Sequence, residues 1–185
     1  MGELTVKILR SGLSRDRPIE VASDGGGFVA DVDGPLFRMA ELFSDIRGAT
    51  RYENMRRNLL AAMVDESIDA ILLNVDSPGG LTDLVPELAA QVRGARGQKP
   101  VWAIANTDAC SAAYWMLCQA DEAVVTPSGI VGSVGVFAAH DDISVMQEKL
   151  GVTTTLVSAG KFKVETSPFA PLSEEARAAI QERVD

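Results

Sequence analysis

Ser111 lies where a nucleophile could be placed, between a short apolar run and a helix-favouring stretch. Residues 101–105 are apolar and residues 106–108 are polar, which predicts a buried strand that ends in a tight turn. Residues 109–120 contain no Gly or Pro and predict a helix that begins near Ser111. Free backbone N–H groups and the helix dipole at such a bend favour the negative charge that develops in acyl transfer. The alternative is an ordinary N-cap, the commoner role of a serine before a helix.

A pair of glycines after another apolar run could supply donors for the same chemistry. Residues 70–75 predict a strand buried on both faces of a parallel sheet, and Asp76-Ser77-Pro78-Gly79-Gly80 follows at once. Glycine tolerates backbone dihedrals that let N–H groups point into a crevice, which would suit an oxyanion hole at the carboxyl end of a strand. An ordinary strand-to-helix turn is the alternative. A phosphate-binding loop is excluded, because neither G-x-x-x-x-G-K-[ST] nor G-x-G-x-x-G follows a strand.

A serine nucleophile needs a neighbouring group that accepts its proton. The single histidine, His140, precedes two aspartates at a predicted helix start, where a histidine is more often a surface residue. Lys161 and Lys163 follow a predicted strand, and a lysine can act as a base when loss of solvent favours its neutral form. Lysines near strand ends are usually solvated. Spacing alone therefore leaves the base open among these three residues.

The elements that must position these residues alternate between strands and helices. Apolar and β-branched runs predict strands at residues 28–32, 70–75, 101–105, 122–126, 132–138 and 153–157. Periodicity and end signals predict helices at residues 52–64, 82–96, 109–120, 141–150 (closed by Gly151) and from Ser173 onward. The alternation indicates an α/β fold with a mostly parallel sheet flanked by helices. Residues 1–27 are weakly patterned, with a flexible hinge at 23–27, and we expect an N-terminal arm before a domain at 28–185.

Composition limits the possible functions. The 185 residues are 46% apolar and 23% charged, with a net charge of −9 and no Lys/Arg stripe, which argues against nucleic-acid binding. Cys110 and Cys118 lie too far apart on one predicted helix to pair, and a single histidine without C-x-x-C makes a structural zinc site improbable. No run is long enough for a membrane helix and no signal pattern is present, so we expect a soluble, intracellular protein. The helical pattern is uncapped at Asp185, and we expect the natural chain to continue.

Several motifs, in this order, resemble those of the S49 peptidases. They are Asp76-Ser77-Pro78-Gly79-Gly80, Ala109-Cys110-Ser111-Ala112-Ala113-Tyr114, Gly132-Ser133-Val134-Gly135-Val136 and Gly160-x-x-Lys163. That family includes signal peptide peptidase A and the head-maturation proteases of tailed bacteriophages. The similarity covers residues 28–185. It implies a crotonase/Clp-like α/β fold and a serine endopeptidase that uses a Ser–Lys dyad, with no metal and no cofactor.

The resemblance also implies roles for individual residues. The nucleophile falls on Ser111, the general base on Lys163, and the serine that hydrogen-bonds the lysine on Ser133. The oxyanion donors fall on the Gly79-Gly80 turn and on the N–H of Ala112. Many signal peptide peptidases have glycines after the nucleophile, where this sequence has alanines. Phage-type members tolerate alanine there.

The resemblance extends to a branch of the family. Residues 34–36, 50–53 and 167–173 look more like the phage minor-capsid group. We therefore expect a protease that processes capsid or scaffold proteins inside a phage procapsid in the host cytoplasm, as a homo-oligomer whose neighbouring subunits share a site. The alternatives are a bacterial cytosolic homologue of signal peptide peptidase, a Clp-like Ser-His-Asp peptidase that uses His140, and a catalytically silent capsid protein of the same fold.

The substrate pocket beside Ser111 is expected to be apolar. Its predicted lining residues are Ala112, Ala113, Ile130 and Val131. An extended peptide would pair its backbone with a free sheet edge in this groove. An apolar pocket rejects a charge that it would have to desolvate unpaired, so the residue before the cleaved bond is expected to be small and apolar.

Overall fold

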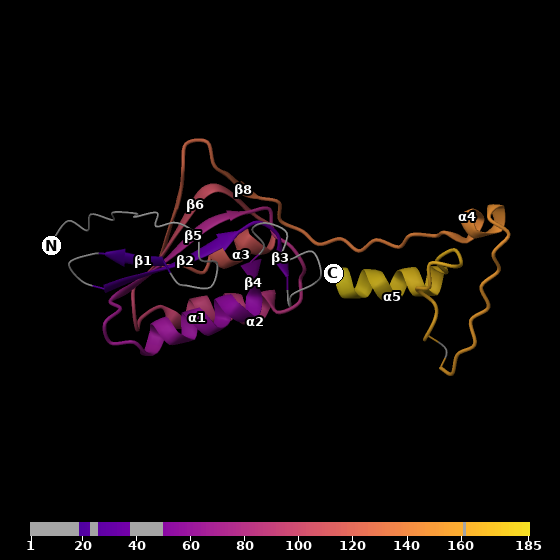
Figure 1. The fold of residues 1–185 in the computed structure, drawn as a ribbon, viewed down its shortest axis with the longest axis horizontal. Helices are drawn as coiled ribbons and strands as arrows, with labels where there is room; N and C mark the ends of the chain where they lie inside the picture. Colours follow the sequence, from indigo (N-terminus) through magenta and orange to yellow (C-terminus); the bar gives the residue numbers. More distant parts are fainter. Residues whose placement is uncertain (1–18, 23–25, 38–49, 161) are drawn as a thin grey trace. The chain divides into compact units, whose positions relative to one another are not determined.

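The largest sheet among the described residues has six strands (Figure 1). The computed structural model describes residues 19–22, 26–37, 50–160 and 162–185. The strand order is β1-β2-β5-β6-β7, and β8 pairs with the later part of β6. The strands are β1 (Ile19–Ala22), β2 (Gly26–Asp33), β5 (Ala70–Ser77), β6 (Val101–Cys110), β7 (Glu122–Val125) and β8 (Ile130–Gly132). The β1–β2 pair is antiparallel and the other pairs are parallel.

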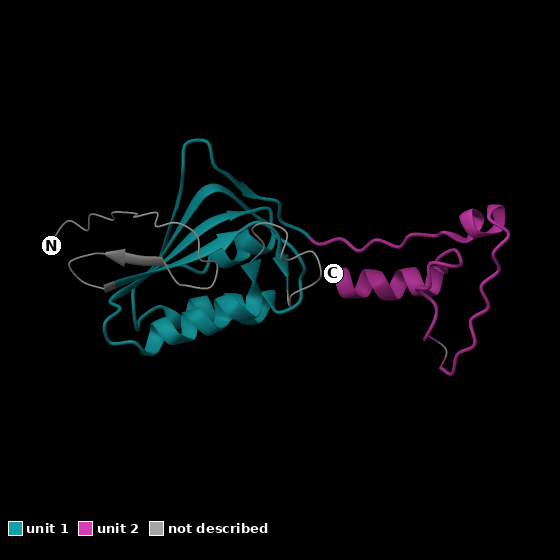
Figure 2. Ribbon diagram, viewed as in Figure 1, with its two compact units in different colours: residues 1–135 teal, residues 136–185 magenta. Residues whose placement is uncertain are grey.

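The chain divides into two units, residues 1–135 and 136–185, coloured separately in Figure 2. The sheet belongs to the first unit. So do α1 (Tyr52–Val64), α2 (Val85–Ala95), α3 (Ala112–Leu117) and a two-stranded sheet of β3 (Leu36–Phe37) and β4 (Thr50–Arg51). The second unit contains α4 (Ser144–Lys149) and α5 (Glu174–Val184).

The core of the first unit lies between the sheet and its helices. Alternate residues of β5, namely Ile71, Leu73 and Val75, are fully buried on one face. The helices α1 and α2 lie side by side (Figure 1) and bury their apolar stripes, such as Leu59 and Val92, in the same cluster. Each such side chain stabilises the fold by about 1.5–3 kcal/mol relative to exposure. The predicted α/β class with a mostly parallel sheet and flanking helices is confirmed.

Several predicted elements are found near their predicted bounds. The helix at 52–64 and the strands at 28–32, 70–75 and 122–126 correspond to α1, β2, β5 and β7. The helix predicted from residue 82 begins at Val85, because Leu84 has a left-handed backbone (φ 69°) that cannot continue a helix. Of the predicted arm at 1–27, residues 1–18 and 23–25 lie outside the described residues. Its segment Ile19–Ala22 pairs with residues 26–29.

The predicted turn at residues 106–108 is wrong, because β6 continues through it to Cys110. The polar residues there find partners in neighbouring strands instead of turning the chain. Thr126 Oγ1 donates to the Asn106 carbonyl (2.8 Å), and residues 108–110 pair with β8. The ladder between β5 and β6 shifts register between Val75 and Ser77, as at a β-bulge. Bulges of this kind redirect the residues that follow them.

Two further predicted strands, at 132–138 and 153–157, are also wrong. The strand at 132–138 ends at Gly132, and residues 153–157 have no regular secondary structure. A β-branched run becomes a strand only when a neighbour supplies ladder hydrogen bonds, and the described part of residues 136–185 contains no strand. The predicted helix ends at Gly151 and Ser173 are confirmed. Gly151 (φ 69°) follows α4, and Ser173 Oγ caps α5 by accepting the Ala176 N–H (3.0 Å).

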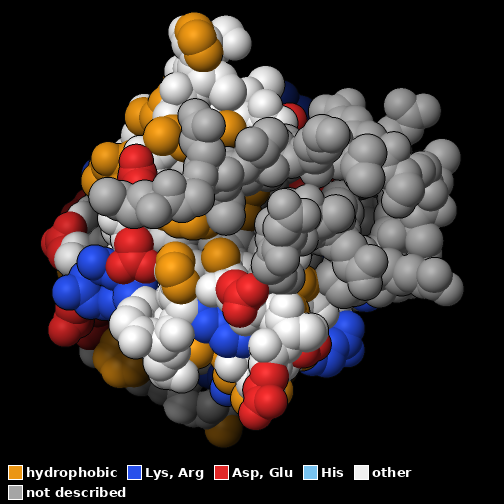
Figure 3. All heavy atoms as spheres, turned by 90° about the vertical axis from the view of Figure 1, so that its left-hand side faces the viewer, with side chains coloured by type: hydrophobic (Ala, Val, Ile, Leu, Met, Phe, Trp, Pro, Cys, Tyr) orange, Lys and Arg blue, Asp and Glu red, His pale blue; other side chains and the backbone are white. Residues whose placement is uncertain are grey.

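Charges of both signs are interspersed on the face shown in Figure 3. Basic side chains lie among acidic ones there, with small apolar groups between them. Arg96 and Asp121 form an ion pair of 2.8 Å between the end of α2 and the start of β7.

No helix in the described ranges is long and apolar enough to cross a membrane.

Candidate active site

Ser111 is the junction between β6 and α3, and its backbone is unusual. It has φ 53° and ψ −121°, a combination that costs a non-glycine residue about 1–3 kcal/mol. Hydrogen bonds hold both sides of the residue: its N–H donates to the Gly132 carbonyl (2.8 Å), and its carbonyl accepts the Trp115 N–H (3.0 Å). Within the described ranges its side chain makes no capping hydrogen bond, so it does not act as an ordinary N-cap. A strained serine at a sharp strand-to-helix turn is the geometry of a nucleophile elbow.

Gly79 is pressed against this elbow. A Cβ added at Gly79 would lie 2.7 Å from both the Ser111 Cβ and the Cys110 carbonyl oxygen. It would also lie 3.1 Å from the Ala112 nitrogen. Gly79 has φ +96°, which side chains rarely adopt. Only glycine therefore allows the turn after β5 to approach the turn after β6 this closely.

The peptide between Gly79 and Gly80 has a defined orientation. The Gly79 carbonyl accepts the Leu36 N–H (3.0 Å). In a trans peptide the C=O and the following N–H point in opposite directions, so the Gly80 N–H points away from Leu36. No hydrogen bond from that N–H occurs within the described ranges. The Gly79 N–H differs, because it donates to Ser77 Oγ (3.1 Å).

A second unused donor comes from α3. Ala112 is the first residue of this helix, where a backbone N–H has no intrahelical partner. No partner for it occurs in the part of the chain that the structure describes. The elbow and the glycine turn packed against it thus each carry one unused backbone donor, Ala112 and Gly80, and such a pair can bind an anionic oxygen.

The end of strand β8 also contacts the Ser111 elbow. Gly132 accepts the Ser111 N–H, and Ser133 follows directly with φ 52° and an exposed side chain. Ile130 and Val131 are 62% and 40% exposed. Ala113 differs from these two residues, because it is completely buried in the core cluster.

The candidate bases belong to the second unit. Lys163 has an exposed side chain, and its N–H donates to the Gly160 carbonyl (3.3 Å). His140 Nε2 lies 3.0 Å from the Ser167 carbonyl oxygen, which can only accept, so Nε2 is the donor. Lys161 lies outside the described residues. The structure therefore brings Ser111, Gly79, Ala112 and Gly132 together, whereas the lysines and the histidine are parts of the other unit.

Ser77 and Leu36 contribute to the site but were not singled out for it from the sequence. Ser77 is completely buried, and Leu36 forms an isolated bridge with Gly80. Ser77 belongs to the Asp76-Ser77-Pro78-Gly79-Gly80 motif, but the sequence assigns no role to its hydroxyl. Leu36 contributes only its backbone, which any residue can offer.

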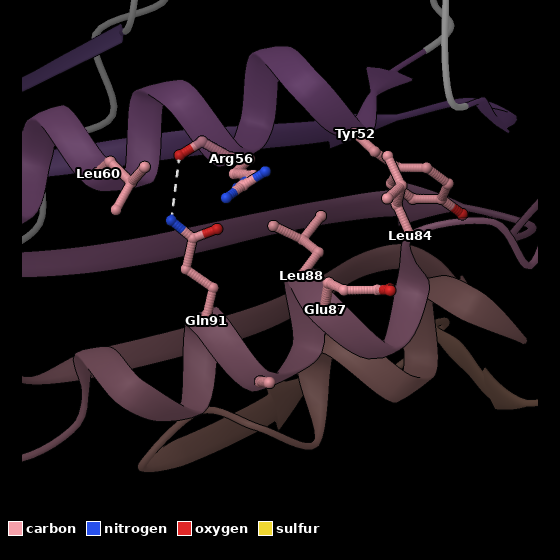
Figure 4. Close-up of a pocket in the computed structure, with 8 residues that line it drawn as sticks. Tyr52, Arg56, Leu60, Leu84, Glu87, Leu88 and Gln91 are labelled. Atoms are coloured by element: carbon pink, nitrogen blue, oxygen red, sulfur yellow. Dashed lines mark hydrogen bonds between the residues drawn. The ribbon is translucent and has the colours of Figure 1, made fainter.

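A separate pocket lies between α1 and α2 (Figure 4). It has a volume of ≈ 440 Å³, and leucines 60, 84 and 88 line it together with Arg56 and Glu87. Gln91 Nε2 donates to the Arg56 carbonyl (3.3 Å) beside it. Tyr52 closes one end, and its hydroxyl donates to the Leu81 carbonyl (2.8 Å). Burial, with a smaller effect of Asp83, raises the pKa of Tyr52 far above its ordinary value, so this hydroxyl stays protonated.

Comparison with known proteins relates this site to a family. Residues 94–185 match the sequence model of peptidase family S49. The resemblance to S49 peptidases is confirmed over that range. The S49 match includes Ser111, Ser133 and Lys163, whereas the Gly79-Gly80 turn precedes it.

Two of the similar curated proteins come from phages. The chain is 34% identical to Capsid assembly protease C of Escherichia phage lambda over 157 residues, which are 85% of this chain and 36% of the relative. It is also 34% identical to Head-tail preconnector protein GP5 of Enterobacteria phage P21, over 85% of this chain and 31% of the relative. The identity to a putative signal peptide peptidase SppA of Enterococcus faecium is 28%, over 98% and 51%. The chain spans about a third of the length of the two phage relatives.

The solved structures that resemble this chain include a mutant of the 1510-N membrane-bound stomatin-specific protease, with a TM-score of 0.48 and 17% sequence identity. The match covers 62% of this chain and 50% of that protease.

Proposed function

We propose that this chain contains the catalytic centre of a serine endopeptidase in which Ser111 is the nucleophile. The observation that carries the proposal is the contact between the Ser111 elbow and the Gly79-Gly80 turn. The proposal is supported by the strained backbone of Ser111 and by the Gly80 and Ala112 N–H groups, which are unused within the described ranges. A strained backbone persists only where its surroundings hold it, and such residues cluster at functional sites.

The proposed reaction is acyl transfer with a Ser–Lys dyad. Ser111 Oγ attacks the peptide carbonyl while the neutral Lys163 amine takes the hydroxyl proton. The carbonyl oxygen becomes an oxyanion and accepts hydrogen bonds from the Gly80 and Ala112 N–H groups. Each such donor contributes about 10²–10³-fold to turnover. The lysine then gives its proton to the leaving amine, and a water molecule hydrolyses the acyl-enzyme. Ser133 is proposed to orient the lysine.

The proposed substrates are capsid or scaffold proteins of a phage, cleaved in the procapsid within the host cytoplasm by a homo-oligomer. The support is the 34% identity to a phage capsid assembly protease and to a head-tail preconnector protein. The exposed Ile130 and Val131 are proposed to contact the substrate, whereas the buried Ala113 shapes the groove from within the core. A cellular peptidase like the signal peptide peptidases is the second candidate. The 28% identity to the Enterococcus faecium protein over 98% of this chain favours it.

A fluorophosphonate probe tests the proposed nucleophile, because it reacts with activated serines. The wild-type protein and the His140→Ala variant are expected to be labelled, and Ser111→Ala is expected to show no labelling. Loss of labelling in His140→Ala as well as in Ser111→Ala would favour a Ser-His-Asp mechanism. Absence of labelling in the folded wild-type protein would support a catalytically silent structural protein.

A further inference from the structure

Ser77 is a buried residue whose hydroxyl makes two hydrogen bonds, one to each of two neighbouring segments. Among the described residues it is the only polar or charged side chain that is fully buried. Its Oγ donates to the Gly34 carbonyl (2.6 Å) and accepts the Gly79 N–H (3.1 Å). One hydroxyl therefore connects the chain after β2 to the turn after β5.

The same two segments are joined by further backbone hydrogen bonds. The Gly34 N–H donates to the Asp76 carbonyl (2.9 Å), and the Leu36 N–H donates to the Gly79 carbonyl (3.0 Å). The Leu81 N–H donates back to the Leu36 carbonyl (3.0 Å). These bonds fix the turn on the side away from Ser111. The Ser77 hydroxyl is the only side chain in this set.

The orientation of the Gly80 N–H depends on these contacts. Glycine has no intrinsic preference that would keep residues 79 and 80 in one conformation. Gly79 is held through its N–H by Ser77 and through its carbonyl by Leu36, so both adjoining peptide planes are set. Without the Ser77 hydroxyl, Gly79 loses one of its two hydrogen bonds, the one that sets the Pro78–Gly79 peptide plane. The turn can then rotate, and the Gly80 donor no longer keeps one direction.

We propose that Ser77 is a positioning residue for the oxyanion hole. It does not touch the substrate, and it acts by holding the Gly79-Gly80 turn in the orientation that directs the Gly80 N–H toward the reacting carbonyl. The inference rests on the proposed peptidase function. It extends that function by assigning a role to a residue outside the proposed nucleophile, base and donors.

The test compares Ser77→Ala with a matched core variant, Val92→Ala. Val92 is also completely buried, but it lies on α2 and makes no contact with the turn through hydrogen bonds. In Ser77→Ala we expect kcat and the rate of fluorophosphonate labelling to fall about 10- to 100-fold, with KM unchanged. Val92→Ala is expected to lower the melting temperature and keep kcat. Ser77→Thr retains the hydroxyl and is expected to recover part of the lost kcat. All variants are compared well below their melting temperatures.

A second measurement is independent of activity. Amide hydrogen exchange, followed by NMR, is expected to be faster at Gly79 in Ser77→Ala and unchanged there in Val92→Ala. If Ser77→Ala does not fold, Ser77→Cys replaces it, because a thiol is only a weak donor.

Each result is decisive. Unchanged kcat in Ser77→Ala despite faster exchange at Gly79 would overturn the positioning role and leave the peptidase proposal intact. Equal losses of kcat in Ser77→Ala and Val92→Ala would show a purely structural role and overturn it as well. A folded wild-type protein that neither cleaves peptides nor reacts at Ser111 would overturn the peptidase proposal itself.

Discussion

At the scale of single residues, the site depends on backbone conformations that cost free energy. Ser111 has positive φ, and flanking hydrogen bonds to Gly132 and from Trp115 hold it there. Gly79 also has positive φ, but glycine adopts it without strain. In this contact the strained conformation is therefore that of Ser111, and Gly79 is the residue type that can pack against it.

Gly79→Ala is expected to disrupt this contact. Its methyl group would lie 2.7 Å from the Ser111 Cβ at a φ of +96°, so the substitution should cost about 1–3 kcal/mol and abolish labelling of Ser111. The control is Gly94→Ala, in α2, where an added Cβ meets nothing within 4 Å. That change should stabilise the protein by about 0.5–1 kcal/mol. Urea unfolding measures both variants, and equal stability of the two would contradict the predicted close approach.

The choice of base is a second prediction for single residues. Lys163→Ala should lower peptidase activity about 10²–10⁴-fold, because the proton of the serine hydroxyl then has no acceptor. Lys161→Ala should retain most of the activity and serves as the control. Equal losses in the two lysine variants would mean that the segment is needed for folding and not for proton transfer.

At the scale of elements, the carboxyl ends of β5 and β6 determine where the candidate site forms. The turn after β5 carries Gly79 and Gly80, and the bend after β6 carries Ser111. Parallel neighbouring strands bring such ends to the same edge of a sheet. The register shift between β5 and β6 and the pairing of residues 108–110 with β8 then direct the end of β6 toward the glycine turn.

The opposite end of β6 is joined to its neighbours by Asp121. Its carboxylate accepts the Val101 N–H (2.9 Å) and the Arg96 Nε–H (2.8 Å), and these bonds lower the pKa of Asp121 below its ordinary value. A carboxyl whose pKa is lower in the folded state stabilises the protein above its unfolded pKa of about 3.9. That contribution is lost as the pH falls through the folded pKa.

Asp121→Asn should therefore be less stable than wild type at neutral pH, and the difference should shrink as the pH falls below about 4. Urea midpoints measured from neutral to acidic pH follow this difference. Asp69→Asn, a change at an exposed aspartate, is the control for the loss of one charge. A stability difference that stays constant with pH would show that the ionised carboxylate contributes nothing to this junction.

At the scale of the whole molecule, the proposed catalytic groups are divided between two units. Ser111, Gly80 and Ala112 belong to residues 1–135, and Lys163 belongs to residues 136–185. The second unit exposes large apolar side chains, such as Phe137 (89%) and Val157 (93%). The sequence resemblance suggests that neighbouring subunits of a ring each supply one part of a site. In that arrangement Lys163 of one subunit would serve Ser111 of the next.

Complementation tests this arrangement. Ser111→Ala and Lys163→Ala protein should each be inactive alone. When they are mixed, some sites should combine an intact serine from one subunit with an intact lysine from another, and activity should return. Sedimentation of the same samples gives the oligomeric state. A monomer without complementation would place both groups of the dyad in one chain.

Local patterns in the sequence were sufficient for the elements that short-range forces determine. The helix at 52–64 follows from its apolar spacing, and the end of α4 from Gly151. The start of α5 follows from the capping serine, Ser173. In each case the hydrogen bonds that form the helix or its end join residues a few positions apart, so the sequence window contains both partners.

The tertiary structure decided what depends on distant partners. Residues 106–108 have the composition of a turn but continue a strand, because Thr126 and β8 supply their hydrogen bonds. Residues 153–157 have the composition of a strand but form none, because no described strand pairs with them. The contact of Gly79 with Ser111 and the burial of Ser77 likewise arise only when the ends of β5 and β6 meet. A hydrogen bond or a close approach between distant segments requires both to be in place, and only the folded chain specifies that.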